Sequence, residues 1–262
     1  MSNHKLSGVR QFTVKVGRLK KISPDIFLMD FSCPWLARTA RPGQFLHLKI
    51  KKTILRRPLS IHRVDKNNVQ LLFRVRGRGT RLLSQYKPGE EIDIIGPLGN
   101  GFAVRKAKGE RREVTNILVA GGMGVAPLVF LAQRLKIGTV VLGAKSKKEL
   151  LCSAEFKKLG FKVLAATDDG SCGTCGTVID VLSEQVIRSA GDRVRLFCCG
   201  PEAMLKAVRE AVQSYPLVRA QLSFEQFMGC GLGVCCGCTI QTKHGYKKVC
   251  QCGPVFDINE IF

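Results

Sequence analysis

Five of the chain's twelve cysteines lie in one stretch, MGCGLGVCCGCTIQTKHGYKKVC, which runs from Met228 to Cys250. Thiols gathered so densely can hold a metal, form disulfides or carry out thiol redox chemistry. Three of them, Cys230, Cys235 and Cys238, are spaced C-x4-C-x2-C and a further one follows later, which is the pattern of plant-type [2Fe–2S] sites. The spacing therefore predicts an iron–sulfur cluster with four ligands: Cys230, Cys235, Cys238 and Cys250.

Glycines separate these cysteines, at positions 229, 231, 233 and 237. A loop wrapped around inorganic sulfide needs positive φ angles and close backbone approach, and glycine permits both. We expect backbone N–H groups of this loop to hydrogen-bond the cluster sulfurs. Cys236 and Cys252 lie beside the predicted ligands, and Cys252 competes with Cys250 for the fourth position.

Other uses of the cysteines fit their arrangement less well. Zinc sites typically use two CxxC pairs, whereas CxxC occurs once among these ligands. A Rieske site would need two histidines, but His244 is alone in the segment. Disulfides are rare in the reducing cytosol. The better thioredoxin-like candidate, Cys172-Gly-Thr-Cys175, lies in a glycine-rich loop and does not open a helix, so two loop thiols without a redox role are favoured.

A second glycine-rich stretch, Ala120-Gly-Gly-Met-Gly-Val-Ala-Pro127, follows an expected strand and precedes an expected helix. Glycines there let the backbone approach a pyrophosphate at the helix N-terminus. The stretch departs from the dinucleotide fingerprint, because Pro127 stands where the third glycine belongs and no acidic residue follows about 20 residues on. A tight turn without a ligand therefore stays an alternative.

Arginine-rich segments upstream offer further anion-binding groups. The segments Arg56-Arg-Pro-Leu-Ser-Ile61 and Arg76-Gly-Arg-Gly-Thr80 combine guanidinium forks, small hydroxyls and free backbone N–H groups. Each signal is weak alone, because basic turns between strands are common.

The secondary structure expected to position these groups differs between the two parts of the chain, and the first part is expected to consist of strands. Residues 68–76 alternate apolar and polar side chains, and the runs 25–31, 43–50 and 91–95 are similar and bounded by Gly, Pro or Asp. Several short strands at such spacing predict a small antiparallel β-barrel.

From residue 114 onward, expected strands alternate with expected helices. The expected strands are 114–120, 139–144, 161–166 and 193–198, and the expected helices are 126–136, 146–160, 178–189 and 201–214. Ser146 and Glu149 form a capping box that opens the second helix. This alternation predicts a doubly wound parallel α/β sheet. The segment from residue 221 is too rich in Gly and Cys to continue it and is expected to be a separate, loop-like subdomain.

Composition limits the partners. The 262 residues are 45% hydrophobic, and 42 Lys and Arg against 20 Asp and Glu give a net charge of +22. The basic residues are scattered and no nucleic-acid-binding motif accompanies them, so we expect steering of anionic ligands or an acidic partner and no nucleic acid. The first 21 residues lack a signal peptide's apolar run and no later run approaches a membrane span, so a cytoplasmic protein without membrane association is expected.

Taken together, these motifs resemble those of the ferredoxin-NADP reductase superfamily over nearly the whole chain. The motifs are Arg57-Pro-Leu-Ser60, Gly77-x-Gly79-Thr80, Gly96-Pro-Leu-Gly99, Gly121-Gly-x-Gly-x-x-Pro127, Cys199-Gly-Pro201 and the C-terminal cysteines. Within the superfamily, RRPLSI, GPLGNGF, FMGCGLGVCCGC and VCQCGPVF are most similar to the electron-transfer subunits of NAD-dependent (B-type) dihydroorotate dehydrogenases, enzymes of pyrimidine biosynthesis.

The resemblance implies three domains: an FAD-binding β-barrel at 1–111, a nicotinamide-nucleotide-binding α/β domain at 112–220, and a [2Fe–2S] segment at 221–262. It implies FAD contacts from Arg57, Pro58, Leu59, Ser60, Leu72, Phe73, Arg74, Gly79 and Thr80. It implies nicotinamide-nucleotide contacts from Gly122, Gly124, Cys199, Gly200 and Pro201, and no catalytic residue in this chain. Leu59 stands where many superfamily members have an aromatic residue.

The resemblance also implies a function in electron transfer. Electrons would pass from an FMN-containing catalytic subunit through the [2Fe–2S] cluster and FAD to NAD+, in a heterotetramer with two subunits of each kind, docked through residues 228–256. Related subunits serve hydrogenase, sulfide dehydrogenase or NADH-ferredoxin:NADP transhydrogenase complexes, which stay as alternatives beside a zinc-stabilised basic interaction module. Three lysines follow the second strand of the nucleotide domain, Lys145, Lys147 and Lys148, so use of NADP also stays open.

Overall fold

The computed structural model describes residues 8–104, 114–189 and 192–261, which divide into two compact units. The first unit combines the chain up to residue 101 with residues 226–240 and 246–254. The second combines residues 102–225 and 241–245 with the chain from residue 255 onward. The predicted boundary at residue 111 lies outside the described residues, and the division into three domains stays a prediction.

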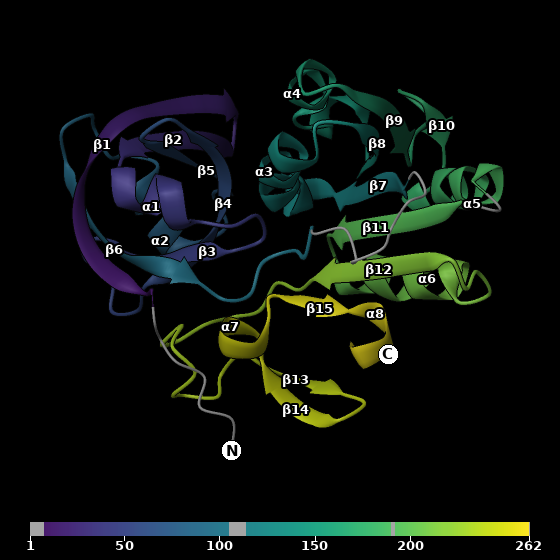
Figure 1. The fold of residues 1–262 in the computed structure, drawn as a ribbon. Helices are drawn as coiled ribbons and strands as arrows, with labels where there is room; N and C mark the ends of the chain where they lie inside the picture. Colours follow the sequence, from purple (N-terminus) through teal and green to yellow (C-terminus); the bar gives the residue numbers. More distant parts are fainter. Residues whose placement is uncertain (1–7, 105–113, 190–191, 262) are drawn as a thin grey trace. The chain divides into compact units, whose positions relative to one another are not determined.

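Six antiparallel strands of the first unit close into a barrel (Figure 1), in the order β1-β2-β5-β4-β3-β6. They are β1 (Arg10–Ser23), β2 (Ile26–Ser32), β3 (Phe45–Lys49), β4 (Arg57–Asp65), β5 (Asn68–Arg74) and β6 (Glu91–Leu98). Short helices α1 (Pro34–Thr39) and α2 (Arg78–Leu83) lie between strands. The alternation in β5 buries Val69 and Leu71 completely. The predicted antiparallel barrel is therefore confirmed.

The second unit is built on a seven-stranded sheet in the order β10-β9-β8-β7-β11-β12-β15. Its strands are β7 (Val114–Gly121), β8 (Gly138–Ala144), β9 (Phe161–Thr167), β10 (Thr174–Cys175), β11 (Arg193–Cys199), β12 (Val218–Ser223) and β15 (Val255–Asp257). Its longer helices are α3 (Val125–Leu135), α4 (Ser153–Lys158), α5 (Val178–Arg188) and α6 (Glu202–Val212). Helix α3 contacts α4, and α5 contacts α6. The first six strands pair in parallel, which confirms the doubly wound α/β sheet.

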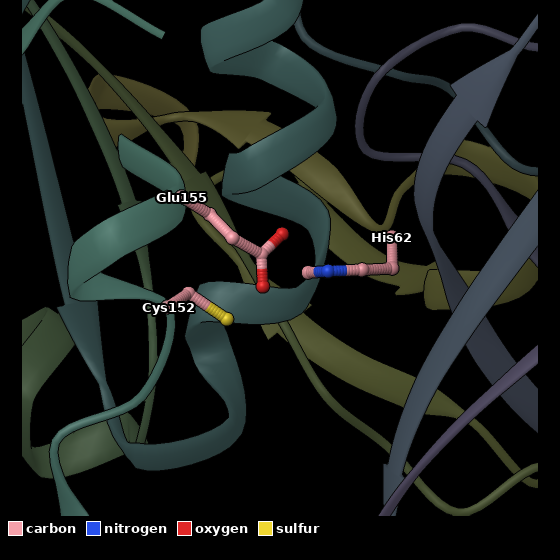
Figure 2. A group of neighbouring side chains, drawn as sticks. All are labelled: His62, Cys152 and Glu155. Atoms are coloured by element: carbon pink, nitrogen blue, oxygen red, sulfur yellow. The ribbon is translucent and has the colours of Figure 1, made fainter. Parts of the chain in front are cut away.

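The predicted helix over 146–160 is wrong in its first part. Ser146 makes no side-chain cap and precedes a short 3-10 turn, in which the Glu149 N–H donates to the Ser146 carbonyl at 3.0 Å and not to its hydroxyl. The Lys147 N–H donates to Ser171 Oγ at 2.8 Å. Helix α4 begins only after Cys152, which has a φ of +60°. Figure 2 shows the Cys152 thiol near the Glu155 carboxylate of α4. Burial, assisted by this carboxylate, raises the pKa of the Cys152 thiol, so the thiol is neutral.

The C-terminal segment contains more regular structure than the loop-like expectation. Strands β13 (Thr239–Thr242) and β14 (Gly245–Lys248) form a separate two-stranded sheet, followed by the short helices α7 (Val249–Cys252) and α8 (Ile258–Ile261) on either side of β15. Strand β15 pairs antiparallel with β12, and Phe256 packs edge-on against Phe224 with ring centroids 5.9 Å apart. The pairing covers an edge that would otherwise be exposed. Among the described residues, no helix is long and apolar enough to cross a membrane.

Candidate functional site

The chain between Cys230 and Cys235 folds around the Cys230 sulfur. Backbone N–H groups of Leu232, Val234 and Cys235 donate to Cys230 Sγ at 3.4, 3.3 and 3.4 Å. Burial opposes ionisation of this sulfur, but the N–H groups outweigh burial and lower the pKa of Cys230 to about 6. The loop therefore favours the thiolate, which is the form that ligates a metal.

Cys238 and Cys250 lie together, both buried, in the same segment. The Cys250 N–H donates to Cys238 Sγ at 3.4 Å, and Cys250 Sγ accepts the Gly233 N–H at 3.2 Å. Burial, together with the nearby sulfurs of Cys238 and Cys230, raises the pKa of Cys250 to about 12. Neighbouring thiolates repel one another, so these thiols do not ionise together on their own. A bound cation offsets the repulsion and stabilises the thiolates that act as its ligands.

The Cys235 thiol lies beside Cys230 and the Cys238 thiol lies beside Cys250, so the four cysteines include two neighbouring pairs. No three of these sulfurs, all within the described chain, lie within 4.8 Å of one another. A single tetrahedral zinc ion would hold four sulfurs at about 2.3 Å from itself, and hence within about 4 Å of each other. Two pairs instead suit a [2Fe–2S] cluster, in which each iron takes two protein ligands.

The two spare cysteines, Cys236 and Cys252, have hydrogen bonds of their own. Cys236 is exposed, has a φ of +57°, and donates its thiol to the Val234 carbonyl at 3.9 Å. Cys252 contacts Asn100 through its main-chain carbonyl. The expected positive φ occurs at Gly231 (+70°) and Gly233 (+80°), whereas the glycines at 229 and 237 do not adopt it. The turn needs only three left-handed residues, and Cys236 is one of them.

Two residues of the first unit that sequence reasoning missed, one in β3 and one after β6, hold this segment at both ends. His47 Nδ1 in β3 lies 3.1 Å from the Cys230 carbonyl oxygen. Asn100 donates its side-chain amide to the Cys252 carbonyl at 2.8 Å and its backbone N–H to the Gly253 carbonyl at 2.6 Å. The available signals were a histidine inside the apolar run QFLHLKI and an asparagine directly after GPLG.

The predicted flavin residues of the RPLS motif open strand β4. Arg57 lies against α2, because a Cβ on Gly79 would stand 2.6 Å from Arg57 Nε. The Thr80 hydroxyl in the same turn accepts the Arg76 N–H at 2.9 Å. Pro58, Leu59 and Ser60 pair with His47, Leu46 and Phe45 of β3. The structure therefore brings Arg57 together with Gly79 and Thr80, as a cationic fork beside a turn rich in backbone donors.

The other predicted flavin residues lie on β5, which pairs with both β2 and β4. Leu72 and Phe73 are buried. The Phe73 ring stacks on Phe27 with centroids 5.8 Å apart, and Arg74 Nε lies 3.2 Å from an Asp25 carboxylate oxygen. The Phe73 ring is thus occupied by barrel packing, and of these three residues Arg74 alone is partly exposed.

The predicted nucleotide residues meet at the carboxyl ends of two central strands of the second sheet, β7 and β11. A Cβ on Gly124 would lie 2.0 Å from the Cys199 carbonyl oxygen, and a Cβ on Gly121 would lie 2.9 Å from Pro201 Cδ. The turn after β7, with Gly122 at a φ of +53°, therefore packs directly on the Cys199-Gly-Pro201 turn after β11. Strands β7 and β11 are adjacent, and the strand order runs outward from them in opposite directions. Ligands of doubly wound sheets bind at such a switch point.

Comparison with known proteins decides the family. A family model described as the iron–sulfur cluster binding domain of dihydroorotate dehydrogenase B matches residues 225–262, and an oxidoreductase NAD-binding domain model matches residues 118–210. The chain is 39% identical over 258 residues to the dihydroorotate dehydrogenase B (NAD(+)) electron transfer subunit of Desulforamulus reducens, covering 94% of this chain and 95% of that protein. The chain belongs to this family. The electron transfer subunit of Geobacillus sp. (strain WCH70) is 41% identical over 265 residues, covering 97% and 99%.

Solved structures of other reductases share the fold of this electron transfer subunit. The NADH-dependent reduced ferredoxin-NADP oxidoreductase structure superposes with a TM-score of 0.80 at 28% identity, covering 95% of this chain and 89% of that chain. A ferredoxin NADP+ reductase from Neisseria gonorrhoeae, solved with FAD and NADP, shares the fold with a TM-score of 0.64 at 16% identity, covering 82% and 99%. The predicted family resemblance is confirmed. The chain is an NAD-linked oxidoreductase subunit, and its family name implies a catalytic partner.

Proposed function

We propose that this subunit carries electrons from the FMN of a dihydroorotate-oxidising partner through a [2Fe–2S] cluster and FAD to NAD+. The observation that carries the proposal is the set of paired cysteine sulfurs, supplied with backbone N–H donors and tied to the barrel strand beside the RPLS motif. The overall reaction is balanced, since dihydroorotate loses two electrons and two protons while NAD+ gains a hydride and one proton is released.

The proposed cluster ligands are Cys230, Cys235, Cys238 and Cys250. The loop holds the first of them as a thiolate, and its backbone N–H groups remain directed at sulfur, where they stabilise negative charge. Cys250 is preferred to Cys252 because its sulfur accepts the Gly233 N–H while its own N–H reaches Cys238.

The proposed FAD site follows the RPLS strand and the turn that opens α2. Arg57 would neutralise the pyrophosphate, with Gly79 and Thr80 beside it, and Ser60 would lie near the reactive ring. The other proposed contacts are Pro58, Leu59, Leu72, Phe73 and Arg74. When bound, FAD supplies the conversion between single electrons and a hydride, which an iron–sulfur cluster alone does not provide.

The proposed nucleotide site is the junction of the turns after β7 and β11. Gly122 and Gly124 would let the nicotinamide nucleotide approach the carboxyl ends of β7 and β11. Cys199, Gly200 and Pro201 would border the nucleotide there. Burial raises the pKa of the Cys199 thiol, so this residue adds no negative charge beside the site. No proton donor is required there, because a hydride carries both electrons to NAD+.

The proposed docking face for the catalytic subunit is the cluster segment itself. Phe227, Val234 and Tyr246 expose 94%, 79% and 76% of their surface, which is unusual for large apolar side chains so close together in sequence. The net charge of +22 favours a partner with an acidic surface. A heterotetramer with two subunits of each kind, in the cytoplasm, completes the proposal.

Two measurements on the purified full chain test this function. Visible absorption with iron, sulfide and flavin analysis should show both cofactors, whereas a colourless protein containing zinc contradicts the relay. Mixing with an FMN-containing dihydroorotate-oxidising subunit should couple orotate formation to NAD+ reduction. Activity with sulfide or ferredoxin, but none with dihydroorotate, would replace the proposed partner.

A further inference from the structure

His47 is a polar side chain buried in an apolar strand. Its neighbours in β3, Phe45, Leu46 and Leu48, are apolar and buried, and His47 itself is 0% exposed. A buried imidazole stabilises a fold only when hydrogen bonds offset the loss of its hydration. The contacts of His47 therefore indicate what it does.

The imidazole contacts the loop at the first proposed cluster ligand. Its Nδ1 lies 3.1 Å from the Cys230 carbonyl oxygen. A Cβ on Gly231 would lie 2.6 Å from the same nitrogen, so the absence of a side chain lets the loop backbone pack directly on the ring. His47 thus sets the distance between strand β3 and this end of the cluster segment.

The main chain of His47 is fixed beside the proposed flavin strand. His47 pairs with Pro58 in the register between β3 and β4. Arg56 Nη1 donates to the His47 carbonyl at 3.2 Å and forms an ion pair of 2.8 Å with Asp93. A shift of His47 would therefore have to move the RPLS strand as well.

The tautomer of the ring follows from its contact with the loop. The Cys230 carbonyl oxygen only accepts a hydrogen bond, so the one N–H of the neutral imidazole lies on Nδ1. Nε2 is left as an acceptor without a hydrogen-bond partner among the described residues. The single N–H is committed to Cys230.

We propose that His47 is a positioning residue for electron transfer, whose Nδ1–H holds the Cys230 end of the cluster segment in a fixed place relative to the Arg57–Ser60 strand. The inference rests on the proposed function. The step it serves moves one electron at a time from the cluster, which is oxidised, to the flavin, which is reduced, and no bond is made or broken in it. Rigid placement matters because outer groups that orient metal ligands affect activity about 10–100-fold.

Three variants of the full chain separate the donor from the bulk of the ring. His47→Asn keeps an N–H donor near the position of Nδ1, whereas His47→Gln places its amide near Nε2 and His47→Leu removes both. Lys49→Gln is the matched control, because Lys49 lies in the same strand and its side chain bonds only the carbonyls of Thr53 and Ile54 among the contacts described.

Stopped-flow absorption after NADH addition measures how fast the cluster is reduced, seen as bleaching of its visible bands. Reduction of ferricyanide by NADH measures the function of the flavin and nucleotide sites and does not require the cluster. We expect cluster bleaching to slow about tenfold in His47→Leu and His47→Gln, with ferricyanide reduction unchanged. His47→Asn and Lys49→Gln should behave like the parent. Hydrogen exchange at Leu232, Val234 and Cys235, whose N–H groups bond Cys230 Sγ, should speed up only in the two slow variants.

The inference would be overturned if His47→Leu bleached its cluster and exchanged its loop amides at the rates of the parent. It would also be overturned if His47→Gln kept the parental rates and His47→Asn did not. If His47→Leu does not fold, the comparison of His47→Asn with His47→Gln still decides it. Failure of the proposed function has a different signature, since the parent itself would then lack cluster absorption or show no bleaching with NADH.

Discussion

At the scale of single residues, the site distinguishes most clearly between Cys250 and Cys252 as the proposed fourth cluster ligand. Cys250 is buried with its sulfur facing Cys238, whereas Cys252 is bonded to Asn100 through its carbonyl. Cys250→Ser should therefore abolish cluster assembly, while Cys252→Ser should retain full iron and sulfide content and the parental visible spectrum. The opposite pattern would move the ligand by two residues.

Gly124 tests the proposed nucleotide site at the same scale. Its Cβ would lie 2.0 Å from the Cys199 carbonyl oxygen, which is a backbone atom, so relieving the clash requires a shift of the main chain. Gly124→Ala should cost about 1–3 kcal/mol in the free energy of unfolding measured with urea, and should weaken NADH binding. Gly77→Ala is the matched control, because nothing lies within 4 Å of its Cβ. Equal stability of the two variants would contradict the close approach of the two turns.

At the scale of elements, an ion pair links barrel strand β6 to the residue that precedes β4. Arg56 lies 2.8 Å from Asp93, and Gln11 of β1 donates to the same carboxylate at 2.7 Å. The Arg56 contact lowers the pKa of Asp93 below its ordinary value. A carboxyl with a lowered folded pKa stabilises the fold above its unfolded pKa, and this contribution disappears as the pH falls through the folded value.

Asp93→Asn should therefore reduce the free energy of unfolding at pH 7, by at most about 1 kcal/mol because the carboxylate is partly exposed. The difference from the parent should shrink as the pH falls below about 4, where the carboxyl also protonates in the parent. Urea titrations at several pH values measure it, with Asp65→Asn at the exposed end of β4 as control. A difference that stays constant with pH would rule out the charge as its cause.

The elements also show what the sequence could and could not predict. The barrel strands, the strands and helices of the parallel sheet and the cysteine ligands were predicted from local sequence patterns, such as period-two alternation and the spacing C-x4-C-x2-C. The contacts of His47 with Cys230 and of Asn100 with Cys252 join residues 183 and 152 positions apart, and no local pattern records such pairs. The start of α4 was mispredicted because the Glu149 N–H, which a capping box would direct to the Ser146 hydroxyl, donates to the Ser146 carbonyl. The neighbouring Lys147 N–H is held by Ser171, 24 positions away, and no local pattern records that contact either.

At the scale of the whole molecule, the proposed relay requires a partner on the cluster segment. Phe227→Ser and Val234→Ser remove exposed apolar side chains, so they should weaken binding of the catalytic subunit about tenfold or more, while cluster content stays parental. Isothermal titration measures the affinity. Ile187→Ser, an exposed apolar residue of α5, is the control, and equal affinity of all three variants would place the docking face elsewhere.

The central claim is that electrons cross this subunit through the cysteine cluster on their way to NAD+. The direct test is anaerobic NADH formation from dihydroorotate and NAD+ by the reconstituted complex, compared between the parent and Cys250→Ser. The account predicts equal amounts of orotate and NADH with the parent, and none with Cys250→Ser, although that variant still reduces ferricyanide with NADH. NADH formation from dihydroorotate at the parental rate by a cluster-free Cys250→Ser complex would contradict it.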